Sequence, residues 1–192
     1  MKKLLIPAIF VASIVAPGAA HAQALPAAII AVVDLDKVTM DCNACKTAAA
    51  SLKSQATALE TRGTALEAPL KTEAQSIQAA LDAAKGNPDA ALQARIKSFQ
   101  TKQQAGAAEL QRKQQELQRN QQYIQQQIAA KLGPIYTQVM QRRGANLLVE
   151  VGATLATSAA IDVTADVTTA LNASLPSLAT TAPAQPQQPQ GR

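Results

Sequence analysis

The sequence predicts a mostly helical α+β protein in which a long antiparallel coiled-coil hairpin projects from a small β-rich oligomerisation body. Two segments of equal length, residues 42–85 and 89–132, have helical apolar spacing. The breaker Gly86-Asn87-Pro88-Asp89 separates them. We expect Gly86 to follow the end of the first helix, Asn87 to cap the second and Pro88 to lie in its first turn. Short β-branched runs lie outside the hairpin on both sides, which places the sheet in the body.

The chain begins with the pattern of a secretory signal peptide, residues 1–22. Lys2 and Lys3 precede an apolar run, and Ala20-His21-Ala22 has the small residues of a cleavage site. We expect cleavage after Ala22 and a soluble, periplasmic mature protein, since no later segment is long and apolar enough to span a bilayer. Removing the signal removes the only histidine, which excludes a His-based triad or a His-rich metal site.

The first body segment, residues 23–41, contains one predicted strand. Its core is the run Ile29-Ile30-Ala31-Val32-Val33-Asp34-Leu35, which is short and β-branched. Residues 36–41 are expected to turn the chain into the hairpin, residues 42–132.

The second body segment, residues 133–171, follows Leu132-Gly133-Pro134, where we expect the arm to end. The pattern predicts a short helix over 134–143 closed by Gly144, a strand over 145–151, a weak strand within 154–160 and a terminal helix over 161–171 capped by Asp162 or Thr164. Residues 172–192 are rich in Ala, Pro, Gln, Thr and Ser and are predicted to be a disordered tail.

The outgoing helix carries a narrow seam of apolar or small residues at steps of four and three. These residues are Leu52, Ala56, Leu59, Gly63, Leu66, Leu70, Ala74, Ile77 and Leu81. On the returning helix one heptad position carries Ile96, Leu110, Leu117 and Ile124, but its companion holds Phe99, Gly106, Lys113, Asn120 and Gln127. Pro69 is expected to bend the outgoing helix.

The hairpin is a basic arm, with 12 basic and 7 acidic residues between Cys42 and Leu132. This excess favours acidic or polyanionic partners over nucleic acid in an exported protein. Two interpretations stay open for each lysine or arginine: a solvated coiled-coil face, or part of a surface that holds an unfolded chain by many weak contacts.

The mature sequence resembles the Skp/OmpH family of periplasmic chaperones over nearly its whole length. The resemblance rests on Ile30-Ala31-Val32-Val33-Asp34, Gly133-Pro134-Ile135, Gly144-Ala145-Asn146-Leu147-Leu148-Val149 and Ile161-Asp162-Val163-Thr164-Ala165-Asp166-Val167, in this order around a long hairpin. It implies a homotrimer in which a β-rich body projects three arms around a basic cavity. It also implies capture of unfolded outer-membrane proteins without ATP or another cofactor.

The candidate client-binding residues are the basic residues of the returning helix, Arg95, Lys97, Lys102, Arg112, Lys113 and Arg119. Phe99, Leu110 and Ile124 could contact apolar clients if the hairpin seam does not use them. Further candidate partners are the outer-membrane assembly machinery and anionic lipid or lipopolysaccharide. No enzymatic activity is expected.

Cys42-Asn43-Ala44-Cys45 follows the first strand at the expected start of a helix, the context in which a thiol-disulfide exchanger places its nucleophile. In an oxidising compartment the alternatives are a local disulfide or a link between subunits. A metal site would need further ligands from other subunits.

Two other functions therefore remain as hypotheses: a structural coiled-coil adaptor of an envelope or export complex, and a CxxC thiol-disulfide oxidoreductase.

Overall fold

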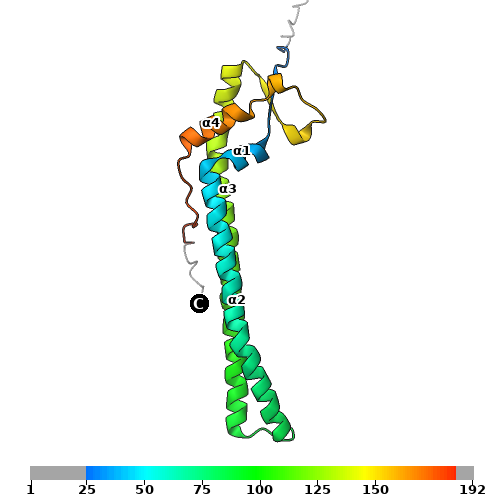
Figure 1. The fold of residues 1–192 in the computed structure, drawn as a ribbon, viewed down its shortest axis with the longest axis vertical. Helices are drawn as coiled ribbons and strands as arrows, with labels where there is room; N and C mark the ends of the chain where they lie inside the picture. Colours follow the sequence, from blue (N-terminus) through cyan, green and yellow to red (C-terminus); the bar gives the residue numbers. More distant parts are fainter. Residues whose placement is uncertain (1–24, 185–192) are drawn as a thin grey trace, which may run out of the picture.

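The computed structural model describes residues 25–184, which form a long helical arm with a small body at one end (Figure 1). The predicted signal peptide with its cleavage point after Ala22 lies outside the described residues, as does the end of the predicted tail, residues 185–192. No helix of the described part is long and apolar enough to cross a membrane.

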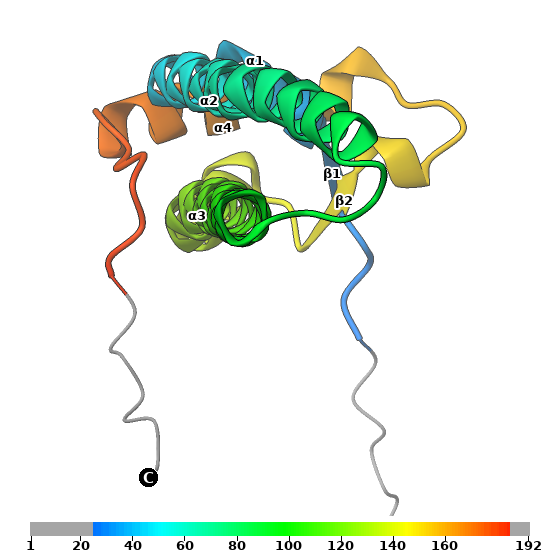
Figure 2. The ribbon, with the colours of Figure 1, turned by 90° about the horizontal axis from the view of Figure 1, so that it is seen from below.

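The arm is an antiparallel pair of helices. Helix α2 covers Asn43–Ala83 and helix α3 covers Ala90–Arg143, with 41 and 54 residues. At about 1.5 Å per residue these helices span roughly 60 and 80 Å. Seen from below in Figure 2, α2 and α3 lie side by side over the body, and Figure 1 shows them separating toward the tip. The predicted hairpin is confirmed.

The tip differs from the prediction in its cap. The carboxylate of Asp89, not Asn87, accepts a hydrogen bond from the N–H of Leu92 at 2.8 Å, and α3 begins one residue after Asp89. Pro88 therefore precedes the cap instead of standing in the first turn. Aspartate is as strong an N-cap as asparagine, and a cap at Asp89 keeps the proline ring outside the helix. Gly86 follows the end of α2 with φ +79°, as expected.

The body contains a two-stranded parallel sheet. Strand β1, Ile30–Val33, pairs with strand β2, Leu147–Glu150, in the register Ile30 to Leu147. Helix α1, Leu35–Asp41, and helix α4, Thr164–Ser174, pack beside the root of the arm (Figure 1). Two short 3₁₀ helices, Val151–Ala153 and Ala159–Ile161, connect β2 to α4.

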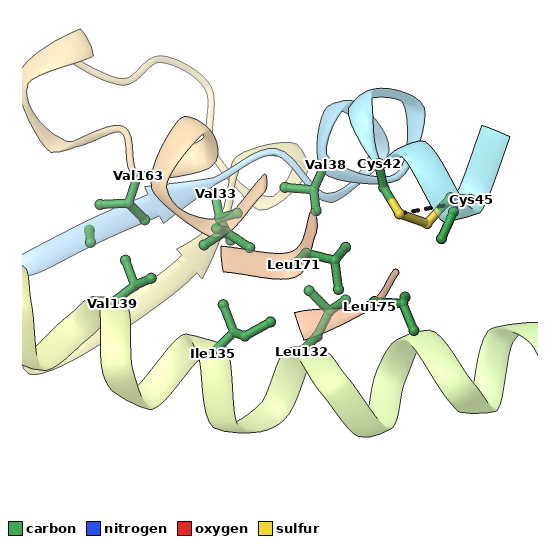
Figure 3. Close-up of a cluster of buried hydrophobic side chains, with 13 residues drawn as sticks. Val33, Val38, Cys42, Cys45, Leu132, Ile135, Val139, Val163, Leu171 and Leu175 are labelled. Carbon is green, nitrogen blue, oxygen red and sulfur yellow. Dashed lines mark hydrogen bonds between the residues drawn. A yellow bond between two sulfur atoms is a disulfide. The ribbon is translucent and has the colours of Figure 1, made fainter. Parts of the chain in front are cut away.

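One hydrophobic core joins the body to the arm (Figure 3). Helix α4 is buried along one side through Val167 and Leu171, and the end of α3 contributes Leu132, Ile135 and Val139. Figure 3 shows these α3 side chains pointing toward α4, with Val33 and Val38 on the far side. The remaining members of the cluster are Ala31, Cys42, Ala44, Cys45, Val163 and Leu175.

Residues 36–41, which were expected to turn the chain into the hairpin, all belong to α1. The carboxylate of Asp34 accepts a hydrogen bond from the N–H of Lys37 at 2.8 Å and caps the helix. This cap also ends the strand at Val33, two residues before the end of the predicted run.

The predicted separate helix over 134–143 is also wrong, since α3 continues through Gly133 and Pro134 to Arg143. Leu132 and Ile135 on either side of the proline are both buried in the same core. This burial outweighs the helical hydrogen bond that a proline removes. Gly144 does end the helix as predicted, with φ +68°.

The predicted weak strand within 154–160 is absent from the described residues. Its only large apolar side chain, Leu155, is fully exposed, so no strand face would be buried. A single bridge pairs Asp162 with Val32 instead. The side chain of Asp162 also accepts from the N–H of Thr164, the first residue of α4, at 2.8 Å, while Val163, and not the predicted Asp162 or Thr164, stands at the cap position itself.

The predicted disorder from Asn172 onward is wrong for residues 172–184. Helix α4 continues to Ser174, Leu175 is buried in the core and Leu178 packs against it. The chain then runs down beside the arm (Figure 1, orange to red). These leucines and the polar contacts described below fix a segment whose composition alone indicated disorder.

Candidate functional site

The contact between α2 and α3, the seam of the arm, determines which residues of the arm are exposed. All nine predicted seam positions of α2, from Leu52 to Leu81, are buried or half-buried. On α3 the positions of Gly106, Asn120 and Ile124 are buried, so the seam includes polar and small residues as well as apolar ones. Near the body both helices are also buried in the core, through Ala44 and Cys45 of α2 and Leu132, Ile135 and Val139 of α3.

The six predicted basic residues all lie on α3. Arg119 is half-buried and the other five are exposed. Lys102 is bound across the hairpin to Glu73 at 2.9 Å. Within residues 25–184 the remaining five, Arg95, Lys97, Arg112, Lys113 and Arg119, form no ion pair.

The positive charge is concentrated on one helix. Helix α3 contains nine lysines and arginines against two glutamates, a formal charge of +7, whereas α2 contains four of each sign and is neutral. A long helix with this excess attracts acidic chains over distances of about a Debye length, roughly 8–10 Å at moderate salt.

A second cross-hairpin ion pair fixes the two helices near the middle of the arm. Arg62 of α2 binds Glu109 of α3 in a two-pronged contact at 2.7 and 2.9 Å. The hydrogen bond from Arg62 holds the pKa of Glu109 below its usual value, and the nearby Lys113 and Arg112 act in the same direction. Glu109 is therefore ionised and is paired with Arg62.

The three candidate apolar contacts belong to the seam to different degrees. Ile124 is buried and is used by the hairpin itself. Phe99 and Leu110 are half-buried and line a hollow of about 570 Å³ between the helices. Gly63 and Gly106, which line the same hollow, face it without side chains. The sequence pattern showed both glycines but not that they line one hollow.

Cys42 and Cys45 are joined in a disulfide at the start of α2 (Figure 3). Their Cα atoms lie 5.1 Å apart, and the N–H of Cys45 also donates to the Cys42 sulfur at 3.2 Å, which caps the helix. Cys42 is fully buried and Cys45 nearly so. Sulfurs joined to each other inside the core are not placed to link subunits, ligate a metal or attack an external disulfide. Among residues 25–184 no group of three or more potential ligands could hold a metal ion.

The protein is therefore a small body from which a long helical hairpin projects, with the basic charge on the returning helix. The family described as "Outer membrane protein (OmpH-like)" matches residues 29–171. This match includes β1, the whole arm and most of α4. The chain belongs to the OmpH-like family.

One solved structure similar to this chain comes from Caulobacter crescentus CB15, where it is described provisionally as an OmpH-like outer membrane chaperone. The two share 22% sequence identity with a TM-score of 0.70, over 86% of this chain and 96% of the other. This likeness shows the shared fold. No match is found among curated proteins.

Proposed function

We propose that this protein is an ATP-independent periplasmic holdase chaperone that binds unfolded outer-membrane proteins and prevents their aggregation before membrane insertion. The observation that carries the proposal is the arm of this OmpH-like chain. Its returning helix has a formal charge of +7 and five candidate cations without an ion pair among the described residues.

The chemistry of the client fits such a surface. Strands of outer-membrane proteins alternate apolar and polar residues and must be kept from pairing edge to edge before they insert. A chaperone without nucleotide can hold such a chain only by contacts that form and break freely. Exposed cations and glutamines on a stiff arm supply weak, dispersed contacts, and the charge accelerates encounter with acidic clients.

We further propose that three copies assemble through the body, so that their arms surround a cavity. A two-stranded sheet leaves both edges open, and sheets of this size are marginal alone. Ile30 and Leu147, which pair in register, are each more than 40% exposed, and Ile29, Leu155 and Ile161 are exposed nearby in the body. A sheet shared between subunits would cover these side chains. Assembly machinery and anionic lipid or lipopolysaccharide are further candidate partners of the basic arms.

The test is to neutralise the five cations of α3. We expect the joint substitution of Arg95, Lys97, Arg112, Lys113 and Arg119 by glutamine to weaken binding of a fluorescent, urea-unfolded porin by about tenfold at low salt. The salt dependence of binding should fall in parallel.

A matched control removes the same number of charges elsewhere. Lys37, Lys46, Lys53, Lys71 and Lys85 lie in α1, α2 and the tip, and their substitution by glutamine changes the net charge equally. Equal loss of binding in both variants would contradict the assignment of the site to α3. Unchanged binding in the first variant would contradict the electrostatic mechanism.

A further inference from the structure

The segment after α4 lies against the arm and is held there by side-chain amides. From Leu175 the chain runs toward the tip beside α2 and α3 (Figures 1 and 2, orange to red). We call residues 179–184 the strap, and the surface that they cover the strap groove.

Four hydrogen bonds from side-chain amides bind the backbone of the strap. The Gln127 side chain donates to the carbonyl of Ala179 at 2.9 Å and accepts from its N–H at 3.1 Å. Gln55 donates to the carbonyl of Thr180 at 3.2 Å, and the Oδ1 of Asn120 accepts from the N–H of Ala182 at 2.8 Å. The groove therefore recognises features that every polypeptide has.

Contact with strap side chains is slight by comparison. Within the described residues the only hydrogen bond to a strap side chain joins the hydroxyls of Ser51 and Thr180 at 3.1 Å. The other strap residues are alanine, threonine and proline, without charge. Apart from this hydroxyl contact, none of these hydrogen bonds depends on the identity of the strap side chains.

The spacing of the groove amides is close to that of an extended chain, and the strap that occupies them bends once, at Thr181. Asn120 and Gln127 are one heptad apart on α3, which is about 10.5 Å along the helix axis. Ala179 and Ala182, the residues that they bind, are three residues apart, which is about 10 Å in an extended chain. The strap runs antiparallel to α3, so one heptad of helix corresponds to three residues of the strap.

The amides of the groove also bind each other. Asn120 is 3% exposed, and its amide nitrogen donates to Gln55 at 2.8 Å, which orients both amides toward the strap. The surface also continues beyond the strap. A pocket of about 160 Å³ follows toward the tip, lined by Gln55, Ala58, Leu59, Arg62, Lys113, Glu116 and Leu117.

We propose that the strap groove is a binding site for an extended polypeptide backbone, which the strap occupies until an unfolded client displaces it. This inference rests on the proposed holdase function and names the contacts that one part of the arm would make. A client segment in the groove would use the same amides and extend into the pocket beyond. Pro176 and Pro183 flank the central strap residues and limit pairing of the displaced strap with client strands.

The strap can compete with a client for the groove because it belongs to the same chain. Four hydrogen bonds to an uncharged segment are weak, but a short connection gives the strap a high effective concentration at the groove. The groove is then empty in only a fraction of the molecules. The apparent affinity of a client for the groove is its intrinsic affinity multiplied by that fraction. Removing the strap should restore the intrinsic affinity.

The first experiment removes the strap by ending the chain at Leu178, which keeps Leu175 and Leu178 on the core. A matched control ends at Ala184 and keeps the strap. We expect the shorter chain to bind a fluorescent unfolded porin about three- to tenfold more tightly than the full chain, and the control to bind like the full chain. Adding Gln127→Ala to the shorter chain should remove the gain. Equal affinity of the shorter and full chains would overturn the proposal.

A second variant keeps the chain length and guards against misfolding of the truncated protein. Ala179→Pro with Ala182→Pro removes both strap N–H donors, whereas Thr181→Pro leaves them in place. The double substitution should tighten porin binding and the single one should not. If both bind porin like the parent chain, the strap does not compete with client.

A third measurement separates the groove from the holdase function. A fluorescent peptide with the sequence of residues 175–184 should bind the chain that ends at Leu178 and not the full chain, and unfolded porin should release it. Peptide binding without any porin binding would contradict the holdase function and with it the exchange. Porin binding that leaves the peptide bound would show that the strap groove is not used by clients.

Discussion

Leu171 of α4 tests the core that joins the body to the arm. Its side chain is fully buried and in Figure 3 lies between Val38 of α1 and the α3 residues Leu132 and Ile135. Leu171→Ala removes three carbons, worth about 2.4 kcal/mol at about 0.8 kcal/mol each. The cavity left between helices adds to this, so we expect the free energy of unfolding to fall by about 2–5 kcal/mol.

Urea denaturation followed by circular dichroism measures this loss, at one protein concentration for all variants. Thr169→Ala lies two residues away on an exposed part of the same helix and should change the free energy of unfolding by less than about 0.5 kcal/mol. A loss below about 1 kcal/mol for Leu171→Ala would refute the close packing of α4 against the arm.

Three further predictions have defined outcomes. Cys42→Ser with Cys45→Ser opens a short loop and should lower the free energy of unfolding by up to about 2 kcal/mol, while suppression of porin aggregation persists; loss of suppression in the folded variant would contradict a purely structural role of the disulfide. Thermal melts should show that Gly144→Ala, at φ +68°, costs about 1–2 kcal/mol, whereas Gly133→Ala, in open space inside α3, gains about 0.5–1 kcal/mol; effects of equal sign would contradict the backbone assignment. The pKa of Asp162 is held below its usual value by hydrogen bonds from the side chain and N–H of Thr164. Asp162→Ala should therefore cost about 1 kcal/mol at pH 7, and urea melts should show this cost shrinking as the pH falls below about 4; a cost that grows in acid would reverse the sign of the argument.

The sequence predicted the features that depend on local periodicity. The apolar steps of the outgoing helix placed every seam residue of α2 correctly, because a helix fixes which side chains share a face. The glycines at 86 and 144 marked the ends of the two arm helices for an equally local reason, since both adopt positive φ.

The errors come from contacts between distant segments. Pro134 suggested a break, but the core on both sides of it keeps α3 continuous. In the sequence, Asn120 and Gln127 are only polar interruptions of the apolar stripe. Their partners in the strap are 62 and 52 residues away in the sequence. A pattern along the helix cannot predict contacts with so distant a segment.

The candidate site was also predictable only in its local features. The sequence located the excess of positive charge on the returning helix, because charge can be counted residue by residue. Which cations are neutralised depends on the register between α2 and α3. The pairing of Lys102 with Glu73, 29 residues away, was therefore not predictable from either helix alone.

The central claim is that the arms hold an unfolded outer-membrane protein without ATP. The most direct measurement is light scattering after dilution of a urea-unfolded porin, with and without the mature protein, at low and high salt, with the mass of the complex measured alongside. We expect scattering to be suppressed near one trimer per client, and the suppression to weaken as salt rises. A correctly folded oligomer that leaves scattering unchanged at low salt would contradict the claim and favour the structural adaptor.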